Sequence, residues 1–169
     1  LVEDLRTLSL ADASELSLDR QRTSPRALLE RLAAAYRHHA DQQGIALCVR
    51  ADAGLPEIDV DAERMVQVLG NLIGNALRYG SRAEVSVMVT DRAVRFTVED
   101  DGPGIPEAAR EAAAAPFTRL DSARNQNRGG GVGLGLALAR DVARQHGGQL
   151  RLGTSDRLGG LRADLVLAR

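Results

Sequence analysis

Two asparagines and an arginine share one face of an expected helix. Asn71, Asn75 and Arg78 are spaced i, i+4 and i+7, which places them on the same side of a helix. An asparagine inside a helix costs about half a kcal/mol relative to alanine, so two of them one turn apart call for a reason. Amide oxygens can bind Mg²⁺, which often bridges substrate phosphates, and the arginine fork suits phosphate oxygens. Taken alone, the pattern is equally consistent with a polar face that is solvated or bonded to neighbouring backbone.

A carboxylate beside two glycines follows an apolar strand pattern. Asp100 precedes Gly102 and Gly104. Its carboxylate can accept a hydrogen bond from an exocyclic amine such as that of adenine, and glycines let the backbone approach a planar ring and turn sharply. Asp-Gly-Pro-Gly is also an ordinary turn composition. Taken alone, this segment favours a plain turn over a binding site. Glu99 and Asp101 are expected to be solvated neighbours rather than ligands.

A glycine-rich segment leads into a helical pattern. Residues 129–135 contain no Gly-Lys-Ser or Gly-Lys-Thr, so they do not form a P-loop. They follow a long loop rather than a strand, which argues against a dinucleotide fingerprint. Backbone amides and the helix dipole at the start of the expected 134–146 helix favour phosphate. We therefore predict a flexible lid over phosphates, and the three segments in this order predict a pocket for ATP with Mg²⁺.

The composition sets limits on the class of protein. The chain has 169 residues and a net charge of −1, which suits one domain with a full core and excludes the concentrated basic excess of a nucleic-acid-binding protein. All 22 basic residues are arginine, so any motif that uses lysine elsewhere must use arginine here. The single Cys48 excludes an internal disulfide, and its place in the apolar run 45–49 predicts a small buried side chain. No apolar run approaches the ~18 residues that cross a bilayer.

Periodicity and turn residues define the elements that position these segments. Ser24 followed by Pro25 is typical of a helix start, Asp61 of another, and Gly80 of a helix end. Residues 102–133 show no long periodic pattern, and loops of that length are usually functional or disordered. Helices with a mostly antiparallel sheet predict an α/β (α+β) two-layer sandwich, in which a mixed sheet packs against helices. We expect helices over 25–43, 61–79 and 134–146, and strands over 15–20, 45–50, 57–60, 84–89, 93–99, 149–153 and 161–168.

Together the segments resemble the catalytic ATP-binding domain of sensor histidine kinases, in the superfamily that includes gyrase, the Hsp90 chaperones and MutL. Residues 71–79 resemble the N box, 98–105 the G1 box, 116–119 the F box and 131–136 the G2 box, with Gly159 and Gly160 where a final glycine motif is expected. The resemblance covers about residues 20 to 168 and implies the Bergerat-type ATP-binding fold. It implies that residues 14–169 are the catalytic domain, with an ATP lid at about 105–133. Leu1, Leu5 and Leu8 share a helical face, so residues 1–13 are expected to be the C-terminal stub of a dimerisation and phosphoacceptor hairpin helix.

The resemblance also implies roles for single residues. Asn75 would bind Mg²⁺, Asn71 and Arg78 would act catalytically on the phosphates, and Asp100 would read adenine. Arg78 stands where lysine is common, which keeps the charge but alters its reach and geometry. Residues 113–115 are alanines where bulkier residues are usual, so the F box is partial. The residues expected to contact ATP are Asn71, Asn75, Arg78, Tyr79, Asp100, Gly102, Gly104, Ile105, Phe117, Arg119, Gly131, Val132, Gly133, Leu134 and Gly135.

Asn71 separates the branches of the superfamily. By this resemblance, ATP-hydrolysing members carry a glutamate at the start of this helix motif, as a base that activates water. An amide cannot take a proton at neutral pH. Asn71 therefore favours phosphoryl transfer to a protein group over rapid ATP hydrolysis.

The histidines of the chain do not fit the acceptor of that transfer. In the family the acceptor lies in a separate helical hairpin and is followed by an acidic residue. His38 and His39 precede Ala40 within the expected 25–43 helix, and His146 is expected at the end of a helix. The acceptor histidine is therefore expected outside these 169 residues, in a separate hairpin domain.

We expect the kinase domain of a two-component sensor, which transfers the γ-phosphoryl group of ATP to a hairpin histidine in its own chain or its dimer partner, with a response regulator downstream. The expected parent is a homodimer anchored in the cell membrane, with this domain in the cytoplasm. Two alternatives remain open. One is a nucleotide-gated interaction module without catalysis, which fits if the partial F box leaves the lid unable to dock. The other is an anti-sigma-factor serine kinase of the same fold, against which the stub at 1–10 argues.

Overall fold

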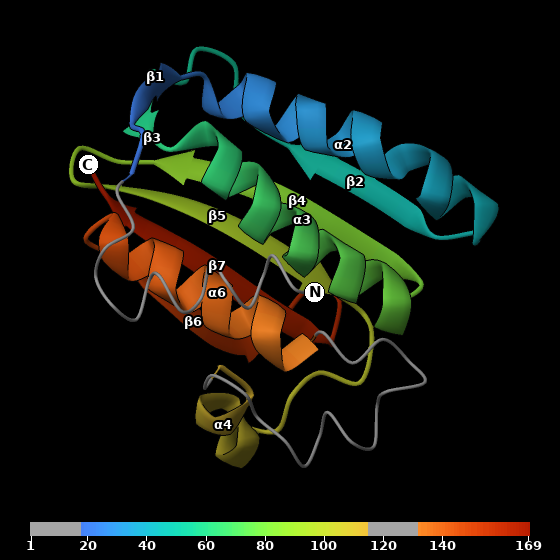
Figure 1. Cartoon of the computed structure of the whole chain (residues 1–169). Helices are drawn as coiled ribbons and strands as arrows, with labels where there is room; N and C mark the ends of the chain where they lie inside the picture. The colour runs from blue at the N-terminus through green and yellow to red at the C-terminus, as the bar shows by residue number, and fades with distance from the viewer. Residues whose placement is uncertain (1–17, 115–131) are drawn as a thin grey trace.

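The computed structural model describes residues 18–114 and 132–169, the side chains of 132–134 excepted. Its main feature is a five-stranded sheet in the order β2-β4-β5-β7-β6, with a helical layer on one face (Figure 1). The strands are β1 (Gln21–Thr23), β2 (Ala46–Arg50), β3 (Ile58–Val60), β4 (Arg82–Val89), β5 (Ala93–Asp100), β6 (Gln149–Thr154) and β7 (Leu161–Ala168). The helices are α2 (Pro25–Gln42), α3 (Ala62–Tyr79), η1 (Glu107–Ala109), α4 (Arg110–Ala114) and α6 (Val132–Gln145).

The sheet is mixed and mostly antiparallel, which confirms the predicted fold class. β4 pairs with β5, β5 with β7 and β7 with β6 in antiparallel register, while β2 runs parallel to β4. β1 and β3 pair only with each other. Of the strand predicted over 15–20, residues 15–17 lie outside the described residues and residues 18–20 form no strand, and β1 begins after them at Gln21. β3 offers only three residues for pairing, and the Asp19 N–H donates to Asp61 Oδ2 at 3.0 Å instead.

Capping residues fix where the predicted helices begin. Ser24 Oγ accepts a hydrogen bond from the Ala27 N–H, and Asp61 Oδ1 accepts one from the Arg64 N–H. These bonds satisfy donors that a helix N-terminus leaves without partners. Its apolar pattern predicts that α3 buries Met65, Val66, Leu69, Leu72, Ile73, Ala76 and Leu77. All of these are buried except Val66, which is half-buried.

Helices α2, α3 and α6 lie side by side across one face of the sheet (Figure 1). Successive side chains of a strand point to opposite faces. In β5, Val94, Phe96 and Val98 are buried in the core, so this alternation directs them toward the helices. None of the helices within the two described ranges is long and apolar enough to cross a bilayer.

Cys48 is exposed, so the prediction of a buried thiol is wrong. Its neighbour Leu47 is buried, and alternation along β2 turns Cys48 to the opposite side. β2 lies at the edge of a sheet whose helical layer covers one face, so an apolar run there has only one buried side.

The first part of the segment predicted as irregular forms short helices. α4 packs against α6, and both Ala113 and Ala114 are buried. Arg110 ties this piece to its surroundings, because its Nε donates to Ile105 O at 3.0 Å and its Nη2 to Thr154 Oγ1 at 3.0 Å. Residues 115–131, which hold much of the predicted lid, lie outside the described residues, as does the predicted stub at 1–13.

Candidate functional site

The three sequence segments meet where the second half of α3, the end of β5 and the start of α6 come together. A Cβ built on Gly135 would lie 3.4 Å from Asn71 Cβ, so α6 packs directly against the asparagine face of α3. A Cβ on Gly102 would lie 2.7 Å from Tyr79 O, so the turn after β5 packs against the end of α3. The fold therefore brings together the described parts of three segments that lie far apart in the sequence.

Asp100 is the buried carboxylate of the site, with 5% of its surface exposed. Its Oδ1 accepts hydrogen bonds from the Gly102 N–H at 2.9 Å and the Leu161 N–H at 3.2 Å. No donor from the described residues is bonded to Oδ2. Burial raises the pKa of Asp100, the two backbone hydrogen bonds lower it in part, and the nearby Asp101 charge adds to the rise. The result is an oriented carboxylate with one oxygen left for a ligand.

Glycines allow the turn between β6 and β7 to lie against Asp100. The Gly160 N–H donates to Asp100 O at 2.9 Å. A Cβ on Gly160 would overlap Asp100 O and Oδ1, and would lie 2.6 Å from Gly102 N. Gly104 has a φ of +71°, a left-handed conformation that glycine adopts at little cost. The backbone around Asp100 therefore requires glycine at these positions.

Glu99 and Asp101, the sequence neighbours of Asp100, form hydrogen bonds within the protein. The expectation that Glu99 is solvated is wrong. Glu99 is 6% exposed, and its Oε1 accepts a hydrogen bond from Ser155 Oγ at 2.9 Å. It is buried because the β6–β7 turn folds over it. Asp101 is half-exposed and accepts hydrogen bonds from Ser81 N at 2.7 Å, Ser81 Oγ at 2.6 Å and Arg82 N at 2.9 Å. These bonds lower the pKa of Asp101 and join the end of α3 to the start of β4.

The predicted phosphate and metal residues lie along α3. Asn71, Asn75 and Tyr79 are half-buried and Arg78 is exposed. Among the described residues no group of three or more His, Cys, Asp or Glu side chains could hold a metal ion. Mg²⁺ often takes one or two protein ligands together with substrate phosphates and water. A single amide oxygen from Asn75 fits that mode of binding.

Several of the residues predicted to contact ATP lie outside the described ranges or at their edges. Phe117, Arg119 and Gly131 lie outside the described residues. Val132, Gly133 and Leu134 belong to the first turn of α6, which begins two residues before the predicted helix. Ile105 is half-buried against the core, and its carbonyl holds Arg110.

Leu161 as a site residue and Ser155 as its support were not predicted from the sequence. Leu161 acts through its backbone N–H, so its side-chain type gives no signal. The Gly159-Gly160 pair was the available sign that the backbone passes close to another part of the site. Nothing in the sequence indicated that Ser155 is buried and bonded to Glu99.

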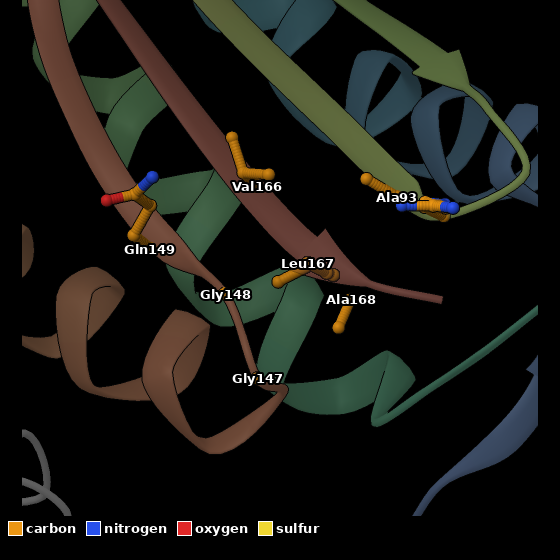
Figure 2. Close-up of a pocket in the computed structure, with 8 residues that line it drawn as sticks. Ala93, Gly147, Gly148, Gln149, Val166, Leu167 and Ala168 are labelled. Atoms are coloured by element: carbon orange, nitrogen blue, oxygen red, sulfur yellow. The ribbon is translucent and has the colours of Figure 1, made fainter.

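A surface pocket lies elsewhere, between the α6–β6 connection and the end of β7 (Figure 2). Gly147, Gly148 and Gln149 line one side, and Val166 to Ala168 line the other. Ala93 also lines it, so the pocket lies at the opposite end of β5 from Asp100. Apart from Arg92, its lining side chains carry no charge, and we assign it no chemistry.

Known proteins match this chain over most of its length. Residues 60–167 match the family model of histidine kinase-, DNA gyrase B-, and HSP90-like ATPases. Sensor histidine kinase GtrS of Pseudomonas aeruginosa is 46% identical over 101 residues, which are 60% of this chain and 20% of GtrS. Virulence sensor protein BvgS of Bordetella bronchiseptica is 33% identical over 157 residues, 89% of this chain and 13% of BvgS. The chain thus spans a minor part of these relatives.

Solved structures agree with the sequence matches. The crystal structure of full-length ShkA in complex with AMPPNP superposes with a TM-score of 0.83 at 27% identity. That match covers 99% of this chain and 34% of ShkA.

Proposed function

Because the chain belongs to the family of histidine kinase-, DNA gyrase B- and HSP90-like ATPases, as an ATP-binding catalytic domain of the sensor histidine kinase type, we propose that it transfers the γ-phosphoryl group of ATP to a histidine of a separate helical hairpin domain. The observation that carries the site assignment is the placement of Asp100. It lies at the junction of the three segments, with one carboxylate oxygen fixed by backbone amides and the other left for a ligand.

At the adenine end, Asp100 Oδ2 would accept a hydrogen bond from the exocyclic amine of the base. Its acceptor role requires the ionised carboxylate. Gly102 and Gly104 would let the backbone lie close to the ring. A hydrogen bond to a buried charged acceptor is stronger than one between neutral groups, so this contact would select adenine over bases that lack the amine.

At the phosphate end, the asparagine face of α3 and the N-terminus of α6 would both contact the triphosphate. The first N–H groups of α6 and its dipole favour negative charge. Arg78 would contact phosphate oxygens, and Asn71 would line the same region. Asn75 would hold Mg²⁺, and the bound ion would supply positive charge that favours the transfer.

Asn71 supports transfer rather than hydrolysis. The residue that lies against the start of α6 is an amide, which cannot remove a proton from water at neutral pH. Phosphoryl transfer depends mostly on positioning and charge neutralisation. These are what the residues of this site can supply.

The acceptor and the other partners would lie in other domains. His38 and His39 are exposed on α2, and His146, which directly follows α6, is buried. We propose a hairpin histidine in the parent chain or its dimer partner as acceptor, and a response regulator as the next protein. We also propose a membrane-anchored, homodimeric parent with this domain on the cytoplasmic side.

The direct test supplies ATP labelled at the γ-phosphate and the histidine hairpin domain of the parent protein. We expect the hairpin to gain an acid-labile phosphate, and the same hairpin with its histidine replaced by glutamine to gain none. Asn75→Ala should lower the rate strongly. An acid-stable phosphate would indicate a serine acceptor instead. Tight ATP binding with no transfer to the hairpin would contradict the kinase proposal.

A further inference from the structure

The turn between β6 and β7 is organised by a buried serine. Ser155 is 1% exposed and lies directly after β6. Its Oγ donates to Glu99 Oε1 at 2.9 Å and accepts from the Leu158 N–H at 3.0 Å. Its backbone N–H donates to Gly160 O at 2.8 Å, and its carbonyl accepts from the Gly159 N–H at 2.7 Å. One residue therefore sets the shape of the whole turn and ties it to β5.

The same turn reaches both faces of β5. Glu99 and Asp100 are consecutive, so their side chains point to opposite faces of the strand. Ser155 binds Glu99 on the face away from the helices. A few residues later the Leu161 N–H binds Asp100 Oδ1 at 3.2 Å on the helix side, and the Gly160 N–H binds the Asp100 carbonyl. The turn therefore wraps the end of β5 and transmits the position of Ser155 to the Asp100 carboxylate.

An ion pair also holds the turn, but its arginine is exposed and its glutamate binds a second arginine. Arg157 Nη1 lies 2.7 Å from Glu84 Oε1, and the Arg157 side chain is 54% exposed. Arg50 Nη1 also lies 2.7 Å from the same oxygen. Glu84 is itself buried, with 6% of its side chain exposed, but it keeps Arg50 as a partner when Arg157 is removed. Removing the Ser155 hydroxyl would instead leave the buried Glu99 Oε1 without the hydrogen bond that it accepts from Ser155. Ser155 and Glu99 are therefore the dominant anchor.

We propose that Ser155 and Glu99 are positioning residues for adenine recognition, because they hold the β6–β7 turn so that its Leu161 N–H fixes the orientation of the Asp100 carboxylate. This inference rests on the proposed role of Asp100 toward the exocyclic amine of adenine. Neither residue touches the nucleotide in this account, so both act through Asp100.

The test compares two nucleotides that differ only in that amine. Calorimetry would measure the binding of ADP and of purine riboside 5′-diphosphate, which lacks the amine, to the wild type and to Ser155→Ala. We expect the wild type to prefer ADP by a factor of about 10 or more, the size of a hydrogen bond to a charged group. We expect Ser155→Ala to lose most of that preference, while its affinity for the purine analogue stays near that of the wild type.

Conservative variants separate positioning from general damage to the fold. Glu99→Gln keeps a carbonyl acceptor for Ser155 Oγ, so it should retain the preference, whereas Glu99→Ala should lose it. Arg157→Ala is the matched control on the same turn and should retain the preference. If Ser155→Ala fails to fold, the two Glu99 variants decide. An equal fall in affinity for both nucleotides, or unfolding of both Ser155→Ala and Glu99→Ala, would assign the pair a purely structural role and overturn the proposal.

The outcomes also separate this inference from the proposed function. A folded wild type that binds neither nucleotide, or binds both equally, would remove the proposed role of Asp100 and the inference with it. A wild type that prefers ADP, together with a Ser155→Ala variant that prefers it as strongly, would leave the role of Asp100 intact and overturn the inference alone.

Discussion

Two consecutive aspartates have different chemistry because their hydrogen bonds differ. Asp101 accepts three bonds from Ser81 and Arg82, and its pKa is lowered. Asp100 is buried, its side chain accepts hydrogen bonds from the described residues through Oδ1 alone, and its pKa is raised. Burial penalises the charged form of a carboxyl, while donated hydrogen bonds favour it. Asp101 is therefore occupied by the protein, and Asp100 retains capacity for a ligand.

Replacing Asp100 should change which base is preferred. Asp100→Asn removes the charge and can present an N–H to the base, which suits a 6-oxo group better than a 6-amino group. We expect ADP affinity to fall by a factor of about 10 or more, as for loss of a hydrogen bond to a charged group, and inosine diphosphate to bind relatively better. Calorimetric titration of both nucleotides measures this. Asp101→Asn is the matched control, and equal ADP affinity in Asp100→Asn and the wild type would contradict the assignment.

Residue types revealed the polar side chains of the site but not its backbone donors. Asn71 and Asn75 stood out because asparagine is costly inside a helix. Asp100 stood out because a carboxylate next to glycines suggests a binding site. Leu161 did not stand out, because every residue other than proline carries the N–H that it donates. Glu99 was misjudged because its burial depends on a turn that follows it by more than fifty residues.

At the scale of elements, α3 serves the core and the site at once. Its apolar stripe packs into the core, while Asn71 and Asn75 lie on the bordering face. Gly74 lies between those asparagines in sequence, and a Cβ there would meet nothing within 4 Å. Gly70, one turn earlier, differs because its Cβ would lie 2.8 Å from Tyr36 Oη.

This difference predicts unequal gains in stability from two alanine substitutions in one helix. Gly74→Ala should raise the free energy of unfolding by about 1 kcal/mol, since glycine inside a helix is less favourable than alanine by that amount. Gly70→Ala should gain less, because Tyr36 must move. Urea unfolding of the nucleotide-free protein measures both, and a larger gain for Gly70→Ala than for Gly74→Ala would contradict the packing described here.

Element bounds were predictable where local chemistry sets them. Ser24 and Asp61 begin their helices as expected, since a cap needs only neighbouring residues. The described part of the strand expected at 15–20, residues 18–20, is not a strand, because strand limits depend on the partner, and β3 offers three residues. The exposure of Cys48 depends on which face of an edge strand the helices cover, which no local pattern contains.

At the scale of the whole molecule, His146 joins α6 to α3. The Asp61 N–H donates to His146 Nε2 at 3.2 Å. Nε2 must then lack a proton, so the neutral ring carries its hydrogen on Nδ1 and donates it to Val142 O at 2.8 Å. Burial lowers the pKa of His146, the bond to Val142 opposes this, and the Arg20 charge adds to the lowering, while Asp61 and Asp59 oppose it.

The sign of this shift predicts acid sensitivity. The unfolded chain takes up a proton on His146 below its ordinary pKa of about 6.5, whereas the folded chain resists it to lower pH. The unfolded state then binds more protons, so this contribution to stability is present above pH ~6.5 and is lost as the pH falls toward the folded pKa. Thermal unfolding between pH 7.5 and 5 should show a steeper decline for the wild type than for His146→Gln, with His39→Gln, on the exposed face of α2, as control. Equal declines in the wild type and His146→Gln would contradict this.

The proposed site requires ATP to bind with Mg²⁺ between Asp100 and the asparagine face of α3. Calorimetric titration of a non-hydrolysable ATP analogue, with and without Mg²⁺, into the wild type and Asn75→Ala would test this requirement. We predict saturable binding that Mg²⁺ strengthens in the wild type, and loss of the Mg²⁺-dependent part in folded Asn75→Ala. Absence of binding by the folded wild type, or the same Mg²⁺ dependence in both proteins, would contradict the account.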